Sequence, residues 1–171
     1  GKHNVLNMML AIDIARNLNV SLKEMNDGLA NLKATSMRLE VEKTDKITII
    51  NDCYNASPDS MKSSIEVLMT KVASRRVAIL GDMYELGSKT EEAHEEVGSF
   101  AKGKIDLLIV IGENVNNYEN GFGSEHIRKF ASKDDFFEEV DNLINKDDVI
   151  LVKASRGMRF EEIISKLKEL K

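Results

Sequence analysis

Residues 47–60 read ITIINDCYNASPDS and join a predicted strand to a predicted helix. Ile47–Ile50 is short, β-branched and apolar, which is typical of a strand. Asn51 and Asp52 then begin a polar turn. Pro58 stands where a helix would start, at the position that proline prefers, with Ser57 as the N-cap. The stretch therefore predicts a strand–turn–helix unit of an α/β fold.

Strands and helices alternate through the rest of the chain. The other main strand candidates are nearly all apolar, which predicts burial on both faces; they are Arg76–Leu80, Leu107–Ile111 and Val149–Val152, with a short candidate at 126–131. Helical spacing covers residues 59–71, 89–102, 134–145 and 159–170. This alternation predicts a Rossmann-like, open and mostly parallel sheet flanked by helices, with the four main strands as neighbours.

The first 36 residues have a different pattern. Apolar residues recur at helical spacing from Asn4 to Leu18, and Ser21 with Glu24 forms a capping box that opens a second helix. Residues 37–41 then read as a strand. We expect a helical segment at 1–36 and a Rossmann-like domain at 37–171.

Composition limits the class of protein. The 171 residues carry a net charge of −5, which argues against a nucleic-acid partner. Cys53 is the only cysteine, so a reducing, cytoplasmic setting is the simplest. The sequence has no apolar run near the roughly 20 residues that span a membrane. Because the chain begins at Gly1 without a methionine, we expect it to be a fragment.

Ligands of such sheets bind beyond the carboxyl ends of the strands. Four segments follow those ends: 51–60, 81–87, 112–114 and 153–157. The first has many side-chain acceptors and an aromatic ring, which suit a ribose and a base. The alternative is a plain connection whose polar side chains satisfy backbone donors. Segment 81–87 is equally compatible with a solvated loop.

Segment 153–157 carries two cations, a hydroxyl and a glycine before a predicted helix. It is a candidate site for a carboxylate or a phosphate. The alternative is that Lys153 and Arg156 are solvated or paired with nearby acids. At the end of the predicted strand Ile47–Ile50 we expect Asp52 to stay solvated, so that Asp52→Asn costs little stability, within about 1 kcal/mol.

One glycine-rich stretch imitates a phosphate-binding loop. Residues 98–104 match the spacing of a P-loop, but Ile105 replaces the final Ser or Thr. The stretch closes a predicted helix and precedes a strand, whereas a P-loop follows a strand and opens a helix. We therefore reject it. The sequence has no Cys/His cluster with metal spacing, so no metal site is expected, and Cys53 lacks a neighbouring base.

Six segments together resemble the Mur ligase family. They read, in chain order, Gly1-x-His3-Asn4-x-x-Asn7, Met37-Arg38-Leu39-Glu40, Asp52-Cys53-Tyr54-Asn55-Ala56-x-Pro58-Asp59-Ser60-Met61, Gly81-Asp82-Met83-x-Glu85-Leu86-Gly87, His94-x-x-Val97-Gly98 and Leu151-Val152-Lys153-x-Ser155-Arg156. The order of the segments makes the resemblance specific, and the third and fourth favour the member that adds D-alanyl-D-alanine.

The resemblance implies a three-domain, ATP-dependent amide ligase of peptidoglycan synthesis. ATP, with Mg²⁺, phosphorylates the terminal carboxylate of a UDP-N-acetylmuramoyl tripeptide, and the amine of D-alanyl-D-alanine attacks the acyl phosphate. Residues 1–36 would end the central ATP-binding domain, and 37–171 would form the C-terminal domain. The P-loop and magnesium ligands would lie in the rest of the same enzyme, so this chain alone is expected to be inactive and to bind no cofactor tightly.

The resemblance also implies roles on the nucleotide side. Asn4 and Asn7 match a nucleotide-side motif of the central domain. Arg38 matches the catalytic arginine that approaches the ATP phosphates. Asp52 matches a ribose contact, and Asn55 lies in the turn beside the adenine.

On the other side, Lys153, Ser155 and Arg156 match the segment that holds the incoming amino acid or dipeptide. This sequence departs from the family pattern at two positions. Ser57 stands where the family usually has Asn, and Ala154 stands where it usually has Gly, which restricts the backbone after the last strand.

Two other functions remain open. The chain could be a standalone Rossmann-like domain that binds a nucleotide or a peptide without chemistry, or a Mur-type ligase for another amino acid. A Gly-x-x-Gly-Lys-[Ser/Thr] loop upstream in the gene would support the ligase.

Overall fold

The computed structural model describes residues 2–31 and 36–170, and the chain divides into two compact units, Gly1–Thr35 and Ser36–Lys171. The first unit holds α1 (Lys2–Asn17) and α2 (Leu22–Ala30). The predicted capping box is confirmed: the Glu24 N–H donates to Ser21 Oγ, and the Ser21 N–H donates to the Glu24 carboxylate at 2.9 Å. Within the described ranges, no helix is long and apolar enough to cross a membrane.

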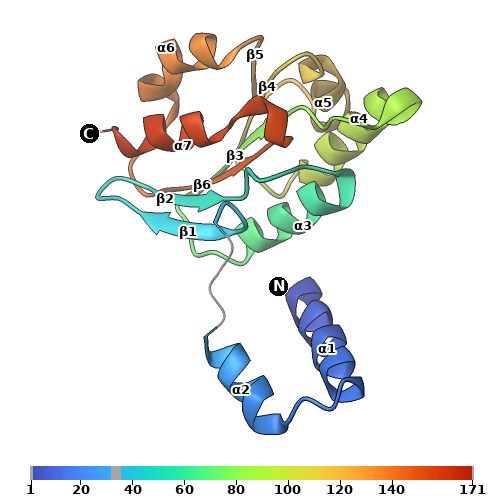
Figure 1. The fold of residues 1–171 in the computed structure, drawn as a ribbon. Helices are drawn as coiled ribbons and strands as arrows, with labels where there is room; N and C mark the ends of the chain where they lie inside the picture. The colour runs from blue at the N-terminus through green and yellow to red at the C-terminus, as the bar shows by residue number, and fades with distance from the viewer. Residues whose placement is uncertain (1, 32–35, 171) are drawn as a thin grey trace. The chain divides into compact units, whose positions relative to one another are not determined.

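The second unit is built on a six-stranded sheet in the order β1-β2-β6-β3-β4-β5 (Figure 1). The strands are β1 (Glu40–Lys43), β2 (Thr48–Asn51), β3 (Arg75–Gly81), β4 (Leu107–Ile111), β5 (Ile127–Phe130) and β6 (Asp148–Lys153). All neighbours are parallel except β1, which pairs antiparallel with β2. The prediction that the four main strands are parallel neighbours is confirmed, as is the fold class.

Helices cover both faces of the sheet. On one face lie α3 (Pro58–Met69), α4 (Thr90–Ala101) and α5 (Val115–Phe122), and on the other α6 (Lys133–Leu143) and α7 (Glu161–Lys168) (Figure 1). Successive strand residues serve opposite faces. Ile50 and Leu80 pack under α3 and α4, whereas Ile49 and Ile79 pack under α6 and α7. This double burial explains why the strands are apolar throughout.

One predicted strand had the wrong bounds, and one helix was missed. The strand expected at 37–41 begins only at Glu40, because Met37 and Leu39 have φ values of 61° and 52°, in the left-handed region. No helix was predicted at α5, whose sequence VNNYENGF has few apolar residues and a glycine near its end. The short strand candidate at 126–131 is confirmed as β5, Ile127–Phe130.

The glycine-rich stretch 98–104 closes α4 and precedes β4, which confirms its predicted place between a helix and a strand. Gly98 has a packing role instead. A Cβ atom at Gly98 would lie 2.2 Å from the carbonyl oxygen of Tyr118, and one at Gly121 would lie 2.0 Å from that of Glu95. The backbones of α4 and α5 therefore approach too closely for a side chain at either glycine.

Gly98→Ala should lower the free energy of unfolding by about 1–3 kcal/mol, because its methyl group would force α4 and α5 apart. Urea denaturation followed by circular dichroism measures the change. The control is Glu95→Ala, an exposed position of the same helix, where a change within about 0.5 kcal/mol is expected. A Gly98→Ala chain as stable as the parent would show that the helix contact is looser than described.

Candidate functional site

A buried ion pair lies at the carboxyl edge of the sheet. Asp52 directly follows β2, and Lys153 ends the neighbouring parallel strand β6, in which Val152 is the partner of Asn51. Lys153 Nζ lies 2.6 Å from Asp52 Oδ2, and the two side chains are only 4% and 11% exposed. Strand order thus brings together two charges that are far apart in sequence.

Further hydrogen bonds satisfy the pair. Asp52 Oδ1 accepts the N–H of Leu39 at 3.1 Å, and Ser64 Oγ on α3 donates to Asp52 Oδ2 at 2.6 Å. Lys153 Nζ also donates to the backbone carbonyl of Asn55 at 2.8 Å. A buried pair needs such bonds to offset the loss of solvation. Here they tie the segment before β1, the turn after β2 and helix α3 to one point.

The expectation that Asp52 stays solvated was wrong. Its burial follows from α3, which places Ser64 over the carboxylate, and from the turn of Leu39 toward it. For Lys153, the alternative of pairing with an acid is what the structure shows. Its ammonium donates to Asp52 Oδ2, Asn55 O and, at 3.4 Å, Asp52 O. These bonds occupy all the protons that this ammonium can donate.

Arg38 is exposed at the same edge. Its guanidinium carbon lies 4.3 Å from the centroid of the half-exposed Tyr54 ring, a cation–π distance. The N–H of Tyr54 donates to the carbonyl of Met37 at 3.2 Å. The left-handed residues Met37 and Leu39 flank Arg38, so a strained backbone presents the guanidinium to solvent.

Arg156 is a second exposed cation nearby. Its Nη1 atom lies 3.3 Å from Glu161 Oε1 and 3.3 Å from the sulfur of Met37, whose neighbour is Arg38. Arg156 begins a short 3₁₀ turn, and α7 starts only at Glu161, later than the helix expected after Gly157. Met37 therefore contacts Arg156 through its sulfur and precedes Arg38 in the chain.

The loop of residues 81–87 packs beside these residues. Asp82 accepts the N–H groups of Glu113 and Asn114, which joins the loop to the one after β4. The N–H of Ser155 donates to the carbonyl of Asp82 at 3.1 Å, and that of Tyr84 donates to Ser155 Oγ at 2.8 Å. The segments expected to meet beyond the strand ends do lie together.

The residues of this edge do not fit a magnesium cage. Asp52 and Asp82 are buried and already accept hydrogen bonds from protein donors. Among residues 2–31 and 36–170 there is no group of three or more His, Cys, Asp or Glu side chains placed to hold a metal ion. Burial raises the pKa of the Cys53 thiol to about 11, so this thiol is neutral near pH 7.

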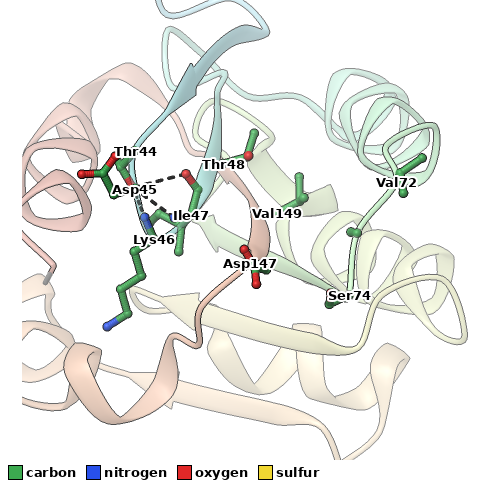
Figure 2. A pocket seen from close by; sticks show the side chains of 10 residues that line it. Thr44, Asp45, Lys46, Ile47, Thr48, Val72, Ser74, Asp147 and Val149 are labelled. Atoms are coloured by element: carbon green, nitrogen blue, oxygen red, sulfur yellow. Dashed lines mark hydrogen bonds between the residues drawn. The ribbon is translucent and has the colours of Figure 1, made fainter.

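A cavity of about 350 Å³ lies at the opposite edge (Figure 2). Its lining comes from the β1–β2 turn, the loop before β3 and the start of β6, and consists of Thr44, Asp45, Lys46, Ile47, Thr48, Val72, Ala73, Ser74, Asp147 and Val149. These segments mark the amino ends of parallel strands, whereas ligands of such sheets bind at the carboxyl ends. None of the predicted site residues lines it.

The structure brings most of the predicted residues to one edge: Arg38, Asp52, Asn55, Lys153, Ser155 and Arg156. Asn4 and Asn7 belong to α1 of the first unit, where Asn7 is exposed. No sequence pattern predicted the contacts of Asp52 with the Ser64 hydroxyl and the Leu39 amide. Both depend on tertiary placement, since a serine within a helix has no local signature of a carboxylate partner.

Comparison with known proteins gives a consistent result. Residues 37–156 match the family described as Mur ligase, glutamate ligase domain. The chain is 39% identical over 176 residues to the UDP-N-acetylmuramoyl-tripeptide–D-alanyl-D-alanine ligase of Bacillus subtilis (strain 168). It is 34% identical over 174 residues to the ligase of the same name from Escherichia coli (strain K12). Each match covers 99% of this chain and 38% of the relative.

Solved structures agree. A crystal structure of MurF from Acinetobacter baumannii matches 99% of this chain and 38% of its own, with a TM-score of 0.89 at 28% identity. The MurF ligase from Thermotoga maritima in complex with ADP covers 96% of this chain and 38% of its own, with a TM-score of 0.79 at 29% identity. The chain thus spans less than two fifths of the length of these relatives.

Asp52→Asn should reduce the free energy of unfolding by about 3–5 kcal/mol, because it leaves the ammonium of Lys153 buried without a counter-charge. This replaces the small loss expected for a solvated carboxylate. Chemical denaturation near pH 7 measures the change. Asp141→Asn, which removes an exposed carboxylate on α6, is the control and should change stability by no more than about 0.5 kcal/mol. Equal effects of the two substitutions would mean that Asp52 is solvated after all.

Proposed function

Because the chain belongs to the Mur ligase family, we propose that it supplies the C-terminal part of an ATP-dependent amide ligase that adds D-alanyl-D-alanine to a UDP-N-acetylmuramoyl tripeptide. The observation that carries the proposal is the presence of two exposed arginines, Arg38 and Arg156, beside a buried ion pair at the carboxyl edge of the sheet. The likeness to ligases of that name over 99% of the chain supports it.

The two units have separate assignments in this proposal. Residues 1–36 form the end of the central ATP-binding domain, where Asn4 and Asn7 belong to its nucleotide-side motif. Residues 37–171 form the C-terminal domain. The rest of the enzyme supplies the phosphate-binding loop and the Mg²⁺ ligands, for which the described residues of this chain offer no cage.

The reaction joins a carboxylate to an amine through an acyl phosphate. ATP transfers its γ-phosphoryl group to the terminal carboxylate of the tripeptide, and ADP leaves. The amine of the dipeptide then attacks the acyl carbon, the amide bond forms, and phosphate leaves. Arg38 contributes a positive charge beside the transferring phosphoryl group, whose negative charge is spread over its oxygens.

The nucleotide side uses the turn after β2. Asn55 and its neighbour Tyr54 are both exposed there. In this proposal Asn55 contacts the adenine. Asp52 Oδ1 accepts one protein hydrogen bond, from Leu39, so one acceptor position remains for a ribose hydroxyl.

On the amino-acid side, Arg156 is the cation that we assign to the dipeptide carboxylate, since its side chain is half-exposed and its contacts are with Glu161 and the sulfur of Met37. Ser155 accepts a hydrogen bond from Tyr84 and keeps its own proton for donation. Lys153 serves this side by holding the strand end in place through Asp52.

The test is a ligation assay in which this chain is joined to the N-terminal and central domains of its enzyme. Product should form only when ATP, tripeptide and D-alanyl-D-alanine are all present. Arg156→Ala should raise the KM for the dipeptide about tenfold or more and leave that for ATP unchanged, because it removes a charge-assisted hydrogen bond.

The matched control is Arg159→Ala, an exposed arginine three residues further on, which should leave both KM values unchanged. A raised KM for ATP with Arg156→Ala would move this residue to the nucleotide side. No ligation with D-alanyl-D-alanine, but ligation with another amino acid, would replace the proposed substrate.

The chain alone should neither hydrolyse ATP nor form the amide bond. Without the phosphate-binding loop, the adenine and ribose contacts should hold ATP with a Kd of about 1 mM or weaker. Calorimetry with ATP and Mg²⁺, beside a phosphate-release assay on the 171-residue chain, measures both. Micromolar binding or steady turnover would contradict this and would reopen stretch 98–104 as a phosphate site.

A further inference from the structure

His94 is fully buried on α4, beneath the loop of residues 81–87, and has no part in the proposed reaction. Its Nδ1 atom lies 2.6 Å from the carbonyl oxygen of Thr90, and its Nε2 atom accepts the N–H of Met83 at 2.9 Å. A carbonyl oxygen only accepts, so Nδ1 carries the proton, while Nε2 must be unprotonated to accept. The two bonds therefore require a neutral imidazole.

The two residues beside Met83 hold Ser155. On one side the carbonyl of Asp82 accepts the Ser155 N–H, and on the other side the Tyr84 N–H donates to Ser155 Oγ. The peptide N–H that His94 fixes thus lies in the middle of this three-residue contact. Movement of Met83 would move both the carbonyl that holds the Ser155 backbone N–H and the N–H that donates to the Ser155 hydroxyl.

We propose that His94 is a positioning residue for the amino-acid side of the site: it fixes the Met83 peptide so that the 81–87 loop holds Ser155, and Arg156 after it, in place for the incoming dipeptide. The inference rests on the proposed function for its substrate. The contact between His94 and Met83 stands independently of that function.

The surroundings of His94 are consistent with a fixed, neutral ring. Tyr118 packs edge-on against it with ring centroids 5.0 Å apart, and the Tyr118 hydroxyl donates to the carbonyl of Gly81 at 2.8 Å. The Asp82 carboxylate, 4.0 Å from Nε2, is the charge that faces the ring from the neighbouring loop. On α4 itself, Glu91 and Glu95 point to solvent.

Burial lowers the pKa of His94 below its ordinary value of about 6.5, more than Asp82 and the Thr90 carbonyl raise it. A histidine with a lowered pKa binds protons more readily when unfolded, so its contribution to stability is present above about pH 6.5 and declines as the pH falls. Protonated Nε2–H would face the Met83 N–H, donor against donor. Acidification should therefore release the Met83 amide first.

Two substitutions separate the hydrogen bond that His94 accepts from Met83 from the packing of the His94 side chain. His94→Gln keeps an acceptor for Met83 and a donor for Thr90 but does not titrate. His94→Leu keeps an apolar volume and removes the acceptor. Val97→Ala, a fully buried site on the same helix, is the control for lost packing without lost loop contact.

The first readout is hydrogen exchange of the Met83 amide in the 171-residue chain, followed by NMR between pH 5 and 8. After correction for intrinsic exchange, protection should fall on acidification in the wild type and stay constant in His94→Gln. Protection should be absent at every pH in His94→Leu. Unchanged protection in His94→Leu would overturn the inference.

The second readout is the ligation assay in the intact enzyme. His94→Leu should raise the KM for D-alanyl-D-alanine about tenfold, the effect of one lost hydrogen bond, without changing that for ATP, and His94→Gln should restore it. Val97→Ala should lower thermal stability and leave both KM values alone. If Val97→Ala raised the KM for D-alanyl-D-alanine as much as His94→Leu does, the effect of His94 would be one of packing alone.

The two readouts distinguish failure of the proposed function from failure of the positioning role of His94. Loss of Met83 protection in His94→Leu, together with a wild-type enzyme that does not use the dipeptide, would refute the proposed function and with it the positioning role in this reaction. Loss of protection with an active enzyme and an unchanged dipeptide KM would refute the positioning role alone.

Discussion

Two opposite charges are buried together where β2 and β6 end, and the carboxyl edge of the sheet is arranged around them. Asp52 and Lys153 meet at 2.6 Å because their strands are parallel neighbours in register. Removing charges from water costs several kcal/mol per ion unless hydrogen bonds complete the pair. The amide of Leu39, the hydroxyl of Ser64 and the carbonyl of Asn55 complete it. The pair therefore fixes the three segments from which these groups come.

This arrangement contrasts two buried charges that hold the edge in place with two cations that are exposed beside them. The buried pair is held by hydrogen bonds to protein partners, whereas Arg38 and Arg156 are exposed. In the ligase that we propose, domain closure would bring these arginines to phosphates and carboxylates held by the rest of the enzyme. In the neighbouring loop of residues 81–87, the buried, neutral ring of His94 likewise accepts the N–H of the Met83 peptide group. The contacts that fix the backbone here are buried, whereas the two arginines are exposed.

The sequence predicted what depends on local pattern. Apolar runs such as Ile47–Ile50 predict buried parallel strands, and Ser57 before Pro58 predicts the start of α3, where a capping box is present. The beginning of β1 could not be predicted, because the left-handed Met37 and Leu39 carry no glycine signal. The Asp52–Lys153 pair could not be predicted either. It joins residues 101 positions apart, which become neighbours because β2 and β6 are adjacent in the strand order β1-β2-β6.

A double-mutant cycle on that pair tests the account most directly. The free energies of unfolding of the wild type, Asp52→Asn, Lys153→Met and the double variant give the coupling between the two side chains. A buried, hydrogen-bonded pair that organises the edge predicts a coupling of about 2 kcal/mol or more, with the double variant more stable than additivity allows. A coupling below about 0.5 kcal/mol would mean that the two residues act independently, and that the edge is organised by other contacts.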